Sequence, residues 1–76
     1  MSKLTIVTPK QMGKISEKCG FYKIRQKGSH VVYQNDKGER VVIPIHPTDL
    51  GRGLIRDTIN DLGISVDEYE RLRKEV

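Results

Sequence analysis

The sequence has few of the residues that build disulfide scaffolds, membrane spans or large aromatic cores. Of its 76 residues, one is a cysteine, one is a phenylalanine and none is a tryptophan. A single cysteine excludes an internal disulfide, and no apolar run approaches the length of a signal peptide or a membrane-spanning helix. We therefore expect one cytoplasmic domain over residues 1–76, with a thin core and no membrane contact.

Acidic residues are too few to balance the basic ones. Fourteen Lys and Arg against ten Asp and Glu give a net charge of +4. Basic residues are in excess between positions 10 and 40, whereas acidic residues are in excess between 57 and 75. A basic first half is typical of a protein that binds a polyanion. A charged, solvated surface would explain the same composition, so charge alone does not decide the function.

Capping and turn residues divide the chain into six elements. Thr8, Pro9 and Gln11 favour a helix start, and Gly20 favours its end. Ser65 favours the start of a last helix. Between these helices the pattern predicts strands at 21–26, 30–34 and 39–45, turns at 27–29 and 35–38, and a helix at 54–62.

This order, αβββα with a further terminal helix, predicts an α+β fold. A three-stranded antiparallel sheet needs helices over one face to be stable, which leaves the other face open to solvent and ligands. Strand alternation places His30 with Val32 on one face and Val31 on the other, but it does not decide which face meets the helices. Pro44 lacks a backbone donor and should lie at an edge or a strand end.

The densest polar cluster is the stretch RQKGSH at residues 25–30. Cleavage of a phosphodiester needs a base for the nucleophilic hydroxyl and cations for the charge that develops on the phosphoryl oxygens. A histidine suits the first task because its reference pKa of about 6.5 lies near neutral pH. In RNA the 2′-OH is a built-in nucleophile, so neither a metal nor a protein nucleophile is required. The alternative interpretation is that residues 25–30 form an ordinary exposed turn without a catalytic role. The candidate site residues are His30 as catalyst, with Arg25, Lys27, Gly28 and Ser29 as phosphate contacts.

Other chemistries fit the sequence poorly. His30, His46 and Cys19 do not have a recognised zinc spacing, and no glycine-rich phosphate loop is present. Cys19 lies on the apolar stripe of the first helix, where a thiol is usually inert. We therefore expect neither a metal nor a cofactor.

His46 is a candidate second catalyst, because it follows the third strand. In a hairpin that turns at 35–38, His30 should lie opposite about residue 43, three residues short of His46. This register favours a structural role for His46.

Four further residues are weaker candidates. Arg52 and Arg56 flank the start of the second long helix, where backbone N–H groups can hold an anion. Tyr22 and Tyr33 can stack on bases, although a thin core favours a packing role for each.

The order and spacing of these residues resemble those of HicA toxins. The resemblance covers about Val7 to Tyr69 and rests on Gly20-Phe21, RQKGSH, Gly38, Pro44, His46, Leu50, Gly53 and the closing LGISVDEY. It implies a small ribonuclease that cleaves mRNA, is inhibited by a HicB antitoxin and folds like a double-stranded-RNA-binding domain. The family's catalytic histidine matches His30.

The chain departs from the family pattern in the second long helix. Leu54-Ile55 stands in place of a Thr-Leu pair, and Thr58 in place of an apolar residue, so we expect this helix to lack a capping hydroxyl and to pack less firmly.

Two other functions would also fit the residues. One is a non-catalytic RNA-binding module of the same fold, and the other is a domain that binds an acidic protein.

Overall fold

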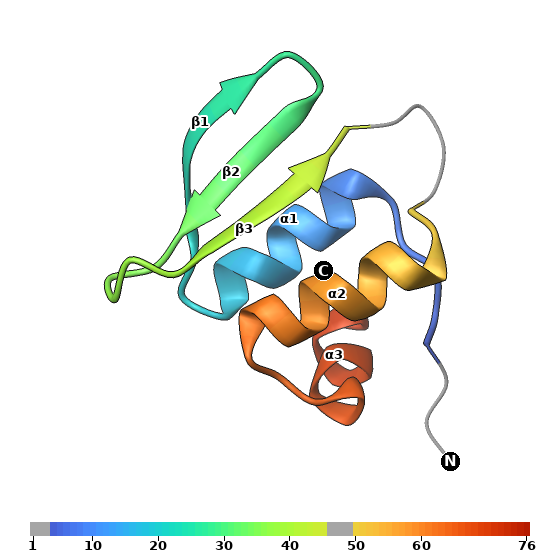
Figure 1. Ribbon diagram of the computed structural model, residues 1–76. Coiled ribbons are helices and arrows are strands. Elements are labelled where there is room, and N and C mark those ends of the chain that lie inside the picture. Colours follow the sequence, from blue (N-terminus) through green and yellow to red (C-terminus); the bar gives the residue numbers. More distant parts are fainter. Residues whose placement is uncertain (1–3, 46–49) are drawn as a thin grey trace.

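The computed structural model describes residues 4–45 and 50–76, and it contains a three-stranded antiparallel sheet with helices on one side (Figure 1). His46 lies outside the described residues. The elements are α1 (Pro9–Lys18), β1 (Tyr22–Lys27), β2 (His30–Gln34), β3 (Arg40–Pro44), α2 (Arg52–Leu62) and α3 (Val66–Arg73). Their order and the sheet order β1-β2-β3 confirm the predicted α+β fold, which is that of a double-stranded-RNA-binding domain.

The core lies between the sheet and the helices. On β3, Val41 and Ile43 are buried while Val42 between them is 47% exposed, so alternate residues face the helix layer. Burying one such aliphatic side chain contributes roughly 1.5–3 kcal/mol relative to leaving it in water. The helices contribute Met12, Ile15, Ile55, Ile59, Leu62, Tyr69 and Leu72 to the same cluster.

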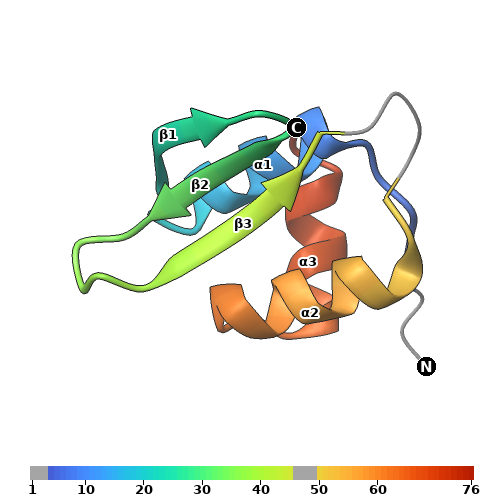
Figure 2. The ribbon, with the colours of Figure 1, turned by 45° about the horizontal axis from the view of Figure 1, so that its top comes forward.

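Strand β1 extends beyond the helix layer. All six of its residues are exposed, and Figure 2 shows β1 along the edge of the sheet farthest from α2. The strand is therefore held by its pairing with β2 rather than by packing. As a result, the side chains of Arg25 and Lys27 are accessible on a sheet edge.

The register of the β2–β3 hairpin differs by one residue from the predicted one. His30 pairs with Pro44 rather than with residue 43, because the closing pair of the loop is Asn35 and Glu39, whose backbones are bonded at 3.0 Å. The loop thus spans three residues and ends at Gly38, whose φ is 85°. This matches a type I turn followed by a left-handed residue. Pro44 ends an edge strand, as predicted.

The start of α2 also differs from the prediction. The helix begins at Arg52 with Gly51 as its N-cap, so position 54 lies inside the helix and is not its cap. Thr58 is only 2% exposed, and its hydroxyl donates to the Leu54 carbonyl oxygen at 2.8 Å. The expected loose packing at Thr58 is therefore wrong, because the helix itself satisfies the buried hydroxyl.

Gly13, in the middle of α1, makes room for the ring of Tyr33. A Cβ at position 13 would lie 2.4 Å from the Tyr33 hydroxyl oxygen and 3.2 Å from the ring carbon that carries it. The glycine costs roughly 1 kcal/mol of helix propensity relative to alanine. Its role is to let α1 approach β2 closely.

We expect Gly13→Ala to lower the free energy of unfolding by about 1–3 kcal/mol, because overpacking outweighs the gain in helix propensity. In a Tyr33→Phe background, which removes the hydroxyl, the same substitution should cost less. Urea unfolding of the four chains of this double-mutant cycle measures the difference. Equal costs in the two backgrounds would contradict the packing explanation.

Candidate functional site

Lys27 and His30 form a cross-strand pair where the β1–β2 turn closes. Side chains paired in this way have Cβ atoms about 5 Å apart. The turn is Gly28-Ser29: Gly28 has a φ of 58°, and no described residue other than glycine has a positive φ. This is the type II′ pattern, in which glycine takes the first central position, so the turn predicted at 27–29 is confirmed.

The side chain of His30 lies on the face away from the helices. On β2, Val31 and Tyr33 pack toward the helix layer, where Val31 is 6% exposed and Tyr33 meets Gly13. Because side chains alternate along a strand, His30, Val32 and Gln34 lie on the opposite face. The sequence did not decide which face of β2 meets the helices, and the structure shows that it is the face with Val31 and Tyr33.

A bulge in β1 places Tyr22 on this same face, together with Arg25 and Lys27. The register with β2 shifts between Lys23 and Arg25, so that Ile24 is the extra residue. Lys23 and Gln26 then share the helix side, and the Lys23 Nζ lies 3.4 Å from the Gln26 Oε1. Tyr22, Arg25 and Lys27 take the other side.

Three cross-strand rows therefore make up what we call the open face. Each row has one residue from β1, one from β2 and one from β3. The rows are Lys27–His30–Pro44 at one end, Arg25–Val32–Val42 in the middle, and Tyr22–Gln34–Arg40 at the other end.

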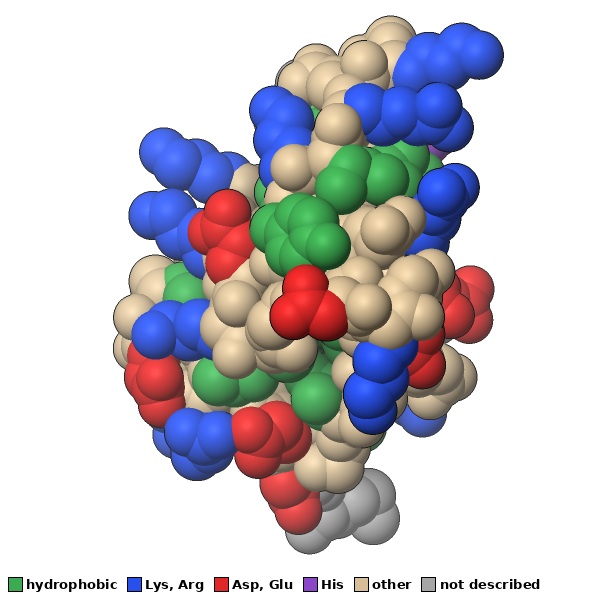
Figure 3. Space-filling model, turned by 90° about the vertical axis from the view of Figure 1, so that its left-hand side faces the viewer, with side chains coloured by type: hydrophobic (Ala, Val, Ile, Leu, Met, Phe, Trp, Pro, Cys, Tyr) green, Lys and Arg blue, Asp and Glu red, His purple; other side chains and the backbone are tan. Residues whose placement is uncertain are grey.

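The open face carries positive charge without compensating acids. Arg25, Lys27 and Arg40 lie on it, and none of its nine residues is acidic. Within the described parts of the chain, the ion pairs involve only cations of the helix layer, namely Lys18, Arg71 and Arg73. Figure 3 shows Lys and Arg around the upper part of the molecule, which the strands form, while Asp and Glu lie lower. An external anion would thus meet cations that have no carboxylate partner within the described residues.

The other predicted residues lie in different places. Ser29 is in the turn beside His30, and its carbonyl oxygen accepts from the Ile45 N–H at the end of β3. Arg52 and Arg56 belong to α2 in the helix layer, on the other side of the sheet from His30. Tyr33 packs against α1, as expected, whereas Tyr22 is 45% exposed, so the packing role predicted for Tyr22 is wrong.

Sequence reasoning missed Arg40, Gln34 and Val42. The Arg40 Nε donates to the Gln34 Oε1 at 2.8 Å, which fixes the guanidinium on the open face. The cause is the hairpin register: the predicted turn at 35–38 sets Arg40 opposite Tyr33, whereas closure of the loop by Asn35 and Glu39 sets Arg40 opposite Gln34.

Cys19 is half-buried at the C-cap of α1. Burial raises the pKa of its thiol, and the nearby Glu68 carboxylate raises it further. The thiol therefore stays protonated at neutral pH, which is the inert state expected from its place on the apolar stripe.

In residues 4–45 and 50–76, no three His, Cys, Asp or Glu side chains gather closely enough to hold a metal ion. None of the helices in these residues is long and apolar enough to cross a membrane.

Residues 9–64 match the model of the family described as the HicA toxin of bacterial toxin-antitoxin. The chain belongs to the HicA toxin family. No curated protein matches the chain. The part of this HicA chain that the family model covers includes all nine residues of the open face and the whole of α2. The shared part of the fold therefore contains the basic face.

Proposed function

We propose that this HicA chain is an endoribonuclease that cleaves mRNA without a metal, with His30 as its catalytic residue. The observation that carries the proposal is the Lys27–His30 pair, an imidazole beside a cation on an exposed basic face. Arg25 lies on the same face one row away. Charge of one sign on an accessible surface attracts a polyanion.

In the proposed reaction, His30 takes the proton of the 2′-OH at the cleavage position. The 2′-oxygen then forms a bond to the adjacent phosphorus, and the bond from phosphorus to the 5′-oxygen breaks. The products are a 2′,3′-cyclic phosphate and a strand with a free 5′-OH, whose oxygen receives a proton from water or from a second group, for which His46 is the candidate. Lys27 and Arg25 balance the charge that develops on the phosphoryl oxygens.

Backbone geometry supports a phosphate contact at the β1–β2 turn. Gly28 has no side chain to keep a phosphate away from the backbone N–H groups. The hydrogen bond from the Ile45 N–H to the Ser29 carbonyl oxygen fixes the turn beside His30. Gly28 and Ser29 would thus position the phosphate while His30 reacts.

We propose further that a HicB antitoxin inhibits this toxin in the cytoplasm by covering the open face. A partner that covers Lys27 and His30 would exclude RNA, and an acidic surface would complement the three cations Arg25, Lys27 and Arg40.

The purified chain should cleave labelled RNA equally well with and without a chelator, because every proposed catalytic group belongs to the protein or the RNA. Added HicB antitoxin should stop cleavage and slow amide exchange at residues 25–34. Loss of cleavage on chelation would contradict the metal-free mechanism. Binding without cleavage would indicate an RNA-binding module of the same fold, and neither binding nor cleavage would indicate a protein-interaction domain.

A further inference from the structure

We propose that Tyr22, Gln34 and Arg40 form a second binding site on the open face, which holds one base of the RNA strand away from the cleavage position. We call these three residues the distal site. The proposal rests on the proposed ribonuclease function, because the distal site acts on a strand whose scissile phosphate lies at His30.

The three residues form one row across the sheet. Gln34 is on the central strand, opposite Tyr22 of β1 on one side and Arg40 of β3 on the other. The Arg40 Nε donates to the Gln34 Oε1 at 2.8 Å. This bond fixes the plane of the guanidinium and uses one of its donors, so the terminal amino groups remain for a ligand.

The side chains of the distal site are those that recognise single-stranded bases. An exposed aromatic ring stacks on a base of any sequence, and a guanidinium plane does the same. Tyr22 is 45% exposed and supplies such a ring, while Gln34 supplies an amide that can bond to a base edge. The row at the other end, with Lys27 and His30, instead offers groups that act on a phosphate.

The middle row connects the two ends with an apolar surface. Val42 is 47% exposed, and a ribose or base can pack on it. Val32, beside it, is 9% exposed although it faces away from the helices. Arg25 lies in this row at the outer edge, where it can contact the strand's phosphates. A single strand can thus follow β2 from His30 to Gln34.

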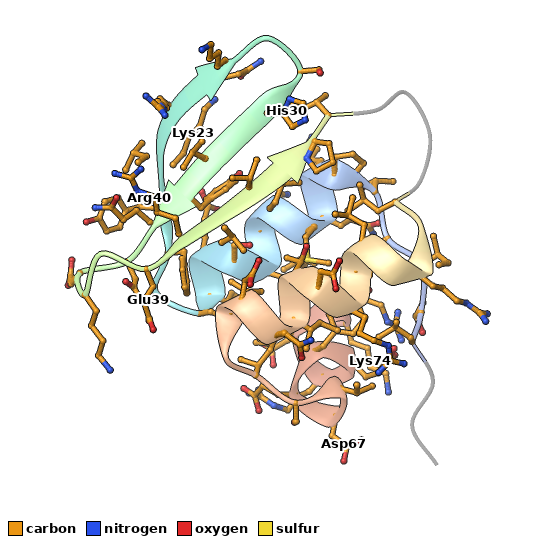
Figure 4. The ribbon with its side chains drawn as sticks, viewed as in Figure 1. Lys23, His30, Glu39, Arg40, Asp67 and Lys74 are labelled. Atoms are coloured by element: carbon orange, nitrogen blue, oxygen red, sulfur yellow. The ribbon has the colours of Figure 1, made fainter. Side chains whose placement is uncertain are left out.

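The length of β2 sets the distance between the two ends. His30 and Gln34 are four residues apart at the two ends of β2, which is about 13 Å along a strand. In Figure 4, His30 lies at one end of the sheet, and Arg40 lies near the β2–β3 turn at the other. Stacked nucleotides rise about 3.4 Å each. The distal base is therefore roughly four nucleotides from the scissile phosphate in a stacked strand, and fewer in an extended one.

The test uses a short RNA whose cleavage position has first been mapped. The same sequence is then made as a 2′-O-methyl strand with one unmodified ribose at that position, and an abasic residue is moved along it one position at a time. For the native chain, one abasic position within about four nucleotides of the cleavage site should lower kcat/KM about tenfold. Tyr22→Ala should lose about tenfold on the intact strand and should no longer respond to that abasic position. Tyr22→Phe keeps the ring and should behave like the native chain, as should the control Lys37→Ala in the β2–β3 turn.

The outcomes separate the distal site from the proposed function. If the native chain cleaves but Tyr22→Ala cleaves equally well, or no abasic position stands out, the distal site is wrong and the ribonuclease function stands. If the chain binds RNA without cleaving it, the Kd of each abasic strand is measured for the native chain and for Tyr22→Ala. An abasic position that weakens binding of the native chain but not of Tyr22→Ala would support the distal site even though the ribonuclease function is wrong, and the absence of such a position would contradict it. If it neither binds nor cleaves RNA, both proposals fall together.

Discussion

Replacing His30 with alanine is expected to lower the rate of RNA cleavage by about 10²–10⁴-fold, the usual contribution of a general acid or base. The chain should stay folded, because His30 is exposed at the start of β2 and contributes little to the core. The matched control Lys37→Ala removes an exposed side chain from the β2–β3 turn, at the other end of the sheet from His30, and should cleave at the native rate. Single-turnover cleavage, with circular dichroism as the check on folding, measures the effect. A folded His30→Ala chain that cleaves normally would refute the catalytic assignment.

The same assay decides whether His46 takes part. If His46 protonates the leaving 5′-oxygen, the rate of the native chain should follow a bell against pH, and His46→Gln should lose one limb together with much of the rate. The register places Pro44, two residues before His46, opposite His30. This is one residue nearer than the predicted register, so His46 remains a candidate, although we still expect His46→Gln to keep the bulk of the activity.

The fold could be predicted from the sequence because its local signals agree. Thr8 and Gln11 form a capping box at the predicted start of α1, and Gly63 ends α2 with a left-handed φ of 75°. The strands lie within one residue of their predicted ends on either side of turns that glycine marks. Where capping, turn chemistry and apolar period point to the same structure, tertiary packing has little to override.

The full extent of the open face could not be predicted, because it depends on register. The predicted pairing of His30 with residue 43 would set Arg40 opposite Tyr33, on the helix side of the sheet. The observed pairing sets Arg40 opposite Gln34 instead, since a slip of one residue moves every side chain to the other face. The bulge at Ile24 has the same effect on β1: it brings Tyr22 onto the face that holds Arg25. Neither the loop length nor the bulge has a reliable sequence signal.

The pairing of Lys27 with His30 could be predicted without information from distant parts of the chain. Lys27 and His30 are separated by a two-residue turn, so any hairpin at Gly28 would bring them together. The Gly28-Ser29 sequence favours a two-residue turn, and such a turn pairs Lys27 with His30. The catalytic candidate was therefore predictable from six residues, whereas the surface around it was not.

Replacing the two β1 cations that lie on the open face, as Arg25→Gln with Lys27→Gln, is expected to weaken RNA binding about 10- to 100-fold at physiological salt, if each contacts a phosphate. Glutamine keeps the stem that covers the sheet while removing the charge. For a single strand, log K falls with log salt by about 0.7 per phosphate contact, so the slope should become shallower by about 1.4. Fluorescence anisotropy with a labelled strand over a range of salt concentrations measures both quantities.

The matched control removes the same charge from the helix layer, as Lys14→Gln with Lys74→Gln, both of which are exposed. Its net charge equals that of the β1 variant, so a general attraction between a basic protein and RNA would weaken equally in the two chains. Contacts at β1 instead change the slope only in the Arg25→Gln, Lys27→Gln chain, because counterions are released where a cation meets a phosphate. Equal slopes of log K against log salt in the two variants would mean that RNA binding depends on the charge of the whole chain. This result would contradict the proposal that the open face is the RNA-binding surface.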